Sequence, residues 1–221
     1  MNLRAMIAEA IGTFTLVFIG VGAIANDASL LGVAFAHGLA IAVMVAATAA
    51  ISGGHLNPAV TVGLLVTGRI GVGDAVSYVV SQLVGATVAA GLLLLTLKDQ
   101  VLPIAVGTPT PGPELVAAQV FVIEAVLTFL LMFVIFGTAA VRAEPAVGGL
   151  FIGLTVTLDI LMGGPLTGAA MNPARHFGPA LFAGPEYLAQ SWIYWLAPFA
   201  GSVAASLLYH HLLHRPEPTS R

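Results

Sequence analysis

Long runs of apolar residues with few charges inside them dominate the chain. Six runs are long enough to cross a bilayer, since a spanning helix needs about 20 mostly apolar residues. Two more runs are about half that length and predict re-entrant half-helices or interfacial segments. The pattern predicts an all-α membrane protein with six transmembrane helices and two re-entrant half-helices. We place the spans at 5–25, 30–51, 74–97, 115–139, 146–163 and 190–213, and the half-helices at 58–66 and 173–182.

The connections between these runs are short. The longest, 98–114, contains four prolines, and we expect no helix there. The first residues lead straight into the first apolar run without a small-residue cleavage site, so we interpret them as part of the first span. Residues 215–221 are interpreted as a C-terminal tail.

The chain repeats itself at an offset of 115 positions. Glu9 and Glu124 lie in the similar stretches AEAIGTF and IEAVLTF, and Asn57 and Asn172 each begin an Asn-Pro-Ala tripeptide. Such self-similarity indicates a duplicated unit. Each half carries three spans, an odd number, so the second half must be inverted relative to the first. We expect a single transmembrane channel domain, 1–221, built from inverted repeats at about 1–110 and 111–214.

Composition excludes several classes of protein. Hydrophobic residues make up 58% of the 221 and charged residues only 8%, against about 25% charged in a soluble domain. A net charge of -3 without a basic cluster argues against a nucleic-acid partner. Cysteine is absent, which excludes disulfides and thiolate metal sites. We expect no metal and no cofactor.

Two rival functions have weaker support. An intramembrane hydrolase needs a nucleophile with a base, or paired aspartates, whereas Asp159 is the only aspartate well inside a predicted span. An alternating-access transporter also uses inverted repeats and broken helices. This chain lacks the charged pair or ion-ligand cluster that coupled transport normally needs. We therefore expect a channel rather than an enzyme.

The two Asn-Pro-Ala motifs indicate where the pore lies. Asparagine is a favoured N-cap and proline is favoured in the first turn, so each motif marks a helix start. Irregular backbone at membrane depth must line a cavity inside the protein. Inversion brings the two starts together near the midplane, where they repel cations and where the Asn amides can donate to a passing oxygen. The predicted pore residues are Asn57, Pro58, Ala59, Asn172, Pro173 and Ala174.

Three charged residues in apolar surroundings are further candidates. Arg175 lies three residues beyond Asn172 and would supply donors and a barrier to cations. The alternative for Arg175 is a salt bridge to an acid of an outer loop. Glu9 and Glu124 are expected to hold the extended backbone before each half-helix, with a proton relay as the alternative.

HLNPAVTVG, MNPARHFGPAL and the glutamate-bearing first and fourth spans resemble the aquaporin superfamily over nearly the whole chain. The resemblance implies a right-handed six-helix bundle with two half-helices, assembled as a homotetramer with one pore per subunit. It implies passage of water and small neutral solutes across the lipid bilayer, with protons and ions excluded. A glycerol or small-polyol facilitator is the alternative. It also implies that His55 presents polar groups to the pore.

The family's selectivity filter, carried over by distance from each motif, falls on His37, Ile160, Ala169 and Arg175. This set resembles the vacuolar-membrane aquaporins of plants. Glycerol facilitators tend to have tryptophan and aspartate where this chain has His37 and His176, which favours the water-channel branch. His37 adds a nitrogen that can donate to or accept from a solute, and our hypothesis is that ammonia passes as well as water and that glycerol passes poorly. The roles of His176 and Asp159 stay open: His176 contacts either the outer loop or the pore.

The basic residues indicate an orientation. With the N-terminus in the cytoplasm, five of the seven basic residues lie inside, as the positive-inside rule requires. These are Arg4, Arg69, Arg142, Arg215 and Arg221, whereas Lys98 and Arg175 lie outside. We expect a multi-pass protein of the cell (plasma) membrane with both termini cytoplasmic.

Overall fold

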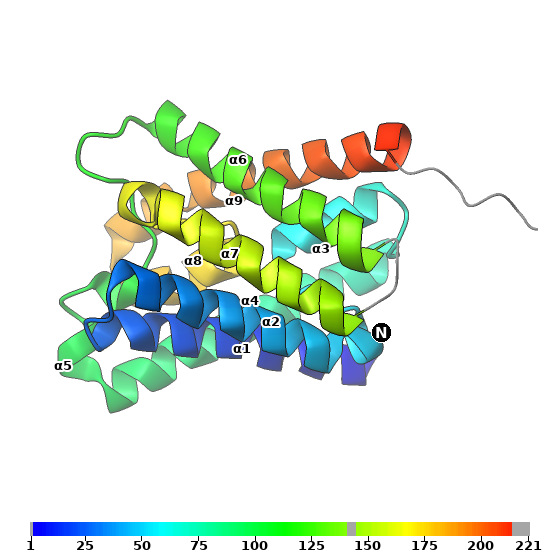
Figure 1. Cartoon of the computed structure of the whole chain (residues 1–221). Helices are drawn as coiled ribbons and strands as arrows, with labels where there is room; N and C mark the ends of the chain where they lie inside the picture. The colour runs from blue at the N-terminus through cyan, green and yellow to red at the C-terminus, as the bar shows by residue number, and fades with distance from the viewer. Residues whose placement is uncertain (1, 141–144, 214–221) are drawn as a thin grey trace, which may run out of the picture.

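The computed structural model describes residues 2–140 and 145–213. Arg142 and the predicted tail 215–221 lie outside the described residues. Within these ranges every regular element is helical (Figure 1). The main helices are α1 (Leu3–Ala25), α2 (Leu30–Ser52), α3 (Pro58–Val66), α4 (Val72–Thr96), α6 (Ala117–Ile135), α7 (Pro145–Thr167), α8 (Pro173–Ala183) and α9 (Pro185–Leu208). π-helical turns extend α6 as η2 (Phe136–Ala140) and α9 as η3 (Tyr209–Leu213).

Six of these helices are long and apolar enough to cross a membrane: α1, α2, α4, α6, α7 and α9. The expected all-α membrane architecture is therefore confirmed. The expectation of no helix in 98–114 was wrong, because Lys98–Val101 forms one turn, α5, before the first proline, and Ala105–Gly107 forms a 3-10 turn, η1. α9 begins at Pro185 rather than 190, since proline fits the first turn of a helix.

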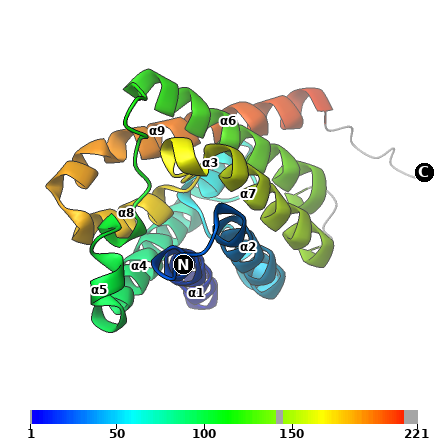
Figure 2. The same ribbon diagram turned by 60° about the vertical axis from the view of Figure 1, so that its left-hand side comes forward.

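The short helices α3 and α8 lie inside the bundle and extend toward opposite ends of it (Figures 1 and 2). Each begins with the expected cap. Asn57 Oδ1 accepts from the Ala59 N–H at 2.8 Å, and Asn172 Oδ1 accepts from the Ala174 N–H at 3.0 Å. Proline follows each asparagine at the first helical position. The same local sequence thus starts both half-helices.

Close glycine contacts join helices both between the two repeats and within each repeat. Gly38 of α2 and Gly153 of α7, one repeat offset apart, pack backbone against backbone, and neither has room for a Cβ. Gly85 of α4 lies against the backbone of α1, and Gly201 of α9 lies against that of α6 in the same way. Small residues at these crossings let membrane helices approach closely.

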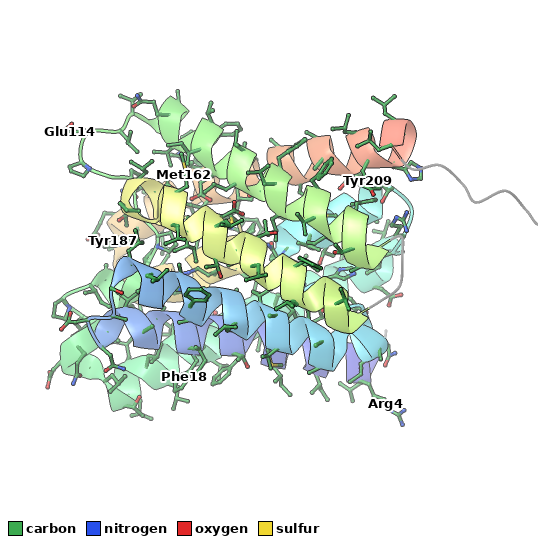
Figure 3. The ribbon with its side chains drawn as sticks, viewed as in Figure 1. Arg4, Phe18, Glu114, Met162, Tyr187 and Tyr209 are labelled. Atoms are coloured by element: carbon green, nitrogen blue, oxygen red, sulfur yellow. The ribbon has the colours of Figure 1, made fainter. Side chains whose placement is uncertain are left out.

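The two ends of the bundle are distinct (Figure 3). Arg4 and Tyr209 lie at one end, and Glu114 and Tyr187 lie at the other. We call these the Arg4 end and the Glu114 end. The start of α1 and the end of η3 therefore share one end, as an even number of crossings requires.

Non-helical segments precede both half-helices, and a buried carboxylate satisfies each one. Glu9 on α1 accepts from the backbone N–H groups of His55 at 2.9 Å and Leu56 at 2.6 Å. It also accepts from the Ser52 hydroxyl at 2.6 Å and the Gln82 amide at 2.7 Å. Backbone amides at membrane depth have no water to bond, so the carboxylate replaces it.

Glu124 on α6 repeats this arrangement for the second segment. It accepts from the backbone N–H groups of Ala170 at 2.9 Å and Met171 at 2.8 Å, and from the Thr167 hydroxyl at 2.6 Å. After the half-helices the offset becomes 116, as the pair Gly85 and Gly201 shows, and the position that matches Gln82 is then Pro198, which has no side-chain donor. Glu124 therefore has one side-chain donor fewer than Glu9.

We expect the substitution Glu124→Leu to destabilise the protein strongly. It leaves the backbone N–H groups of Ala170 and Met171 unpaired in the interior, at a cost of about 1–3 kcal/mol for each donor. The measurement is thermal unfolding of the detergent-solubilised protein, followed by tryptophan fluorescence. Glu186→Gln, at an exposed position in the first turn of α9, is the control and should melt like the wild type. Equal melting of Glu124→Leu and the control would contradict the proposed role.

Candidate pore

A cavity of about 380 Å³ lies between the helices and is lined by both repeats. One wall is apolar and includes Ile41, Val45, Leu131, Ile135, Ile152 and Val156. The opposite wall comes from the two non-helical segments and the starts of α3 and α8, including Gly53, His55, Asn57, Met171, Asn172 and Arg175. The polar groups of the lining therefore come mainly from this second wall, with His37 and Arg69 as polar members outside it.

The two Asn-Pro-Ala motifs are joined by a reciprocal pair of hydrogen bonds, which we call the clasp. The Asn57 amide donates to the Met171 carbonyl at 2.9 Å, and the Asn172 amide donates to the Leu56 carbonyl at 2.9 Å. An amide nitrogen carries two hydrogens, so each asparagine has one hydrogen left that can donate to a molecule in the cavity.

The proline and alanine of each motif are buried in the first turn of the half-helix. Pro58, Ala59, Pro173 and Ala174 thus begin the helices, and the asparagines form the lining.

A second cavity of about 450 Å³ opens toward the Glu114 end and is bordered by the proline-rich segment 108–113. His37, Ile160 and Arg175 line both cavities. Ala169 lines the first, and its neighbour Gly168 lines the second. The structure therefore brings the four predicted filter residues to one place, which we call the neck.

Arg175 is held at the neck by two partners. Its Nη1 donates to the Gly107 carbonyl at 2.7 Å, and its Nη2 lies 3.3 Å from Nε2 of His37. Gly107 ends a run with positive φ, 50° at Ala105, 55° at Val106 and 66° at Gly107, which turns this carbonyl toward the guanidinium. The side chain is 4% exposed. Its hydrogen bonds in the described chain go to a carbonyl and an imidazole rather than to an outer-loop acid.

Both ring nitrogens of His37 are occupied. Nδ1 lies 2.9 Å from the carbonyl of Val33, which can only accept, so Nδ1 carries the proton. In the neutral ring Nε2 is then the acceptor, and Arg175 donates to it. Neither nitrogen is therefore left over for a solute in this structure, whereas the passage of ammonia stays a prediction.

His55 lies between the clasp and the Arg4 end, where it lines the cavity. Its Nδ1 is 3.0 Å from the Thr61 hydroxyl, and its ring meets that of Tyr78 edge to face at 5.0 Å. Thr61 Oγ also contacts the Gln82 amide at 3.1 Å and the Asn57 carbonyl at 3.1 Å. Sequence reasoning missed Thr61, Gln82 and Gly107, because nothing in the local pattern distinguishes them.

Two residues with open roles lie outside both cavity linings. His176 stacks on Tyr194 with ring centroids 4.2 Å apart, and its Nε2 is 3.0 Å from the Ser191 hydroxyl. It thus contacts α9 rather than the pore lining. Asp159 of α7 is 3% exposed, and its Oδ2 is buried without a hydrogen-bond partner in the described chain. The described residues contain no cluster of three or more His, Cys, Asp and Glu side chains that could hold a metal ion.

Comparison with known proteins agrees with this architecture. The family model described as major intrinsic protein matches residues 1–209. Aquaporin TIP4-4 of Zea mays is 43% identical over 234 residues, covering 97% of this chain and 90% of that protein. Glycerol uptake facilitator protein-like 6 of Lactiplantibacillus plantarum is 38% identical over 206 residues, covering 92% and 95%.

Among solved structures, the aquaglyceroporin from Plasmodium falciparum is similar, with a TM-score of 0.85 and 27% identity, covering 96% of this chain and 97% of that one. The family match covers residues 1–209, and the inverted half-helices and the paired asparagines are consistent with it. The chain therefore belongs to the major intrinsic protein family, the aquaporins and their relatives, which are passive integral membrane channels and not enzymes.

Proposed function

We propose that this chain conducts water and excludes protons and ions. The observation that carries the proposal is the mainly one-sided polar lining that leads through the neck at Arg175. A water molecule entering a narrow pore must replace the hydrogen bonds it gives up. The free amide hydrogens of Asn57 and Asn172 and the guanidinium of Arg175 can replace them on one side. The apolar wall opposite binds nothing, so water can leave each position quickly.

Cations meet two barriers along this path. The starts of α3 and α8 meet at the clasp, and each carries a partial positive charge of about half a unit. Arg175 adds a full charge at the neck. A cation would lose hydration there and find positive charge in its place, which opposes sodium and ammonium alike.

His55 supplies an acceptor on the Arg4 side of the clasp. The Thr61 hydroxyl has one hydrogen, which its bond to the Asn57 carbonyl uses. The oxygen of Thr61 then accepts from Gln82 and from Nδ1 of His55. His55 Nδ1 is therefore protonated, and Nε2 remains as the acceptor for a passing molecule.

Selectivity among neutral solutes is the finer part of the proposal. The neck pairs the donors of Arg175 with the apolar Ile160 and Ala169, which suits a small molecule such as ammonia and gives glycerol few partners for its three hydroxyls. One similar protein is named as a glycerol uptake facilitator-like protein, and one similar structure is that of an aquaglyceroporin. Glycerol conduction is therefore the second candidate, and flux measurements separate the two.

Assembly and orientation follow from the surface. Large apolar side chains such as Val43 at 63% and Leu158 at 66% are exposed, as lipid-facing or subunit-facing positions would be. We propose a homotetramer with one pore per subunit.

Arg4 and Arg69 lie toward the Arg4 end and Lys98 toward the other, which supports a cytoplasmic Arg4 end. The similarity to TIP-type aquaporins favours a vacuolar membrane over the cell membrane expected from the sequence.

Liposomes containing the protein should shrink quickly in an osmotic step, with low activation energy and without saturation. Stopped-flow light scattering measures this, and a pH-sensitive dye reports protons in the same vesicles. We expect no proton flux above that of empty liposomes, because both the clasp and Arg175 oppose it. Proton flux through the wild-type pore, or water flux equal to that of empty vesicles, would contradict the proposal.

The double variant His37→Phe, Ile160→His should reduce ammonia flux more than water flux. It removes the acceptor that orients Arg175 and places a polar ring on the apolar side. The measurement is internal pH change during an ammonia gradient, compared with osmotic water flux. Leu158→Ile, on the exposed face of the same helix, is the matched control. Equal loss of both fluxes, or wild-type ammonia uptake no faster than that of empty vesicles, would show that this is a plain water channel.

The protonation of His55 can be observed directly. In ¹⁵N spectra of histidine-labelled protein, Nδ1 of His55 should appear protonated and Nε2 unprotonated. The resonances of His55 are assigned by their loss in His55→Ala. Thr61→Val keeps the side-chain shape but removes the oxygen that accepts from Nδ1, so it should mix the two tautomers. A bare Nδ1 in the wild type would mean that Thr61 donates to the ring instead.

A further inference from the structure

The imidazole of His37 occupies the space where a side chain on Gly20 would lie. A Cβ added at Gly20 would overlap Nε2, Cδ2 and Cε1 of that ring, the last at 2.5 Å. His37 is itself 3% exposed and cannot withdraw into solvent. The ring therefore rests directly on the backbone of α1.

The inverted repeat provides an internal comparison. At the offset of 115, Gly20 matches Ile135 and His37 matches Ile152. Both isoleucines line the central cavity on the apolar wall. One half of the pore thus fills this space with two isoleucines, whereas the other fills it with a glycine and an imidazole. The missing side chain at Gly20 accommodates the larger polar ring.

The position of this ring also determines that of Arg175. His37 is fixed on one side by the bond from Nδ1 to Val33, and its Nε2 then meets Nη2 of Arg175 at 3.3 Å. A ring pushed away from α1 must move into the neck, lose its contact with Arg175, or both. Either change alters the opening between His37, Ile160 and Arg175.

We propose that Gly20 is a specificity-determining position of the channel, which acts by seating His37 against α1. The proposal deepens the function proposed above and rests on it. Gly20 touches no permeating molecule; it is a positioning residue, and its effect passes through the imidazole.

The first test compares Gly20→Ala with Gly22→Ala. Both lie on α1 and gain the same methyl group, but a Cβ at Gly22 meets no atom within 4 Å. We expect Gly20→Ala to lower osmotic water permeability by about tenfold, because an extra methyl group in a packed site strains its neighbours and raises the barrier. Gly22→Ala should conduct like the wild type. Equal permeability of the two variants would overturn the proposal.

A double-substitution cycle shows whether the effect passes through His37. With His37→Ala the ring is gone, so adding Gly20→Ala should change permeability by less than about twofold, since the two substitutions act on one contact. A further tenfold loss in this background would show that Gly20 serves helix packing instead. If Gly20→Ala fails to fold, folding of the double variant supports the proposal, and misfolding of both contradicts it.

A spectroscopic measurement tests the seating of His37 without relying on water flux. The ¹⁵N resonances of His37, assigned by their loss in His37→Ala, should shift in Gly20→Ala and stay in place in Gly22→Ala. If the wild type conducts no water, the proposed function fails, while these shifts still decide whether Gly20 seats the ring. Unchanged His37 resonances in Gly20→Ala would overturn the inference even in a conducting channel.

Discussion

Two stretches of non-helical backbone, 53–57 and 168–172, lie inside a protein that is otherwise helical through the bilayer, and their N–H groups have no water to bond. Glu9 and Glu124 accept from these groups. Because the carboxylates draw the N–H groups toward the helices behind, the two segments can line the cavity with their other side. The pore wall thus depends on two buried acids that do not line it. A proton relay through them is not needed to explain why carboxylates stand at these positions.

The two repeats share their scaffold and differ in their lining. The capping asparagines, the glutamates and the close glycine contacts recur between the repeats at an offset of 115 or 116. Other matched positions have diverged: Gln82 corresponds to Pro198, and Gly20 and His37 correspond to Ile135 and Ile152. A symmetric scaffold can therefore carry an asymmetric path, with the charged neck toward the Glu114 end and His55 toward the Arg4 end.

Much of the fold could be predicted from the sequence, since span length, the two short runs and the repeat offset are local or periodic signals. The meeting of Asn57 and Asn172 followed from inversion alone. Other features required neighbours distant in sequence. Whether the nitrogens of His37 are free depends on Val33 and on Arg175, 138 positions away. The Gly107 carbonyl likewise depends on positive φ in a loop whose prolines suggested no regular structure.

The neck combines parts that come from separate elements. Arg175 belongs to α8, its carbonyl partner Gly107 to η1, and His37 to α2, with α1 behind it. Since the guanidinium has one anchor in a loop and one on a helix, moving either changes both the width of the neck and the number of donors that face the path. In the proposed filter His37 consequently acts through the donor that it occupies on Arg175 rather than through a nitrogen of its own. A substitution at His37 would therefore alter size, polarity and the placement of the positive charge together.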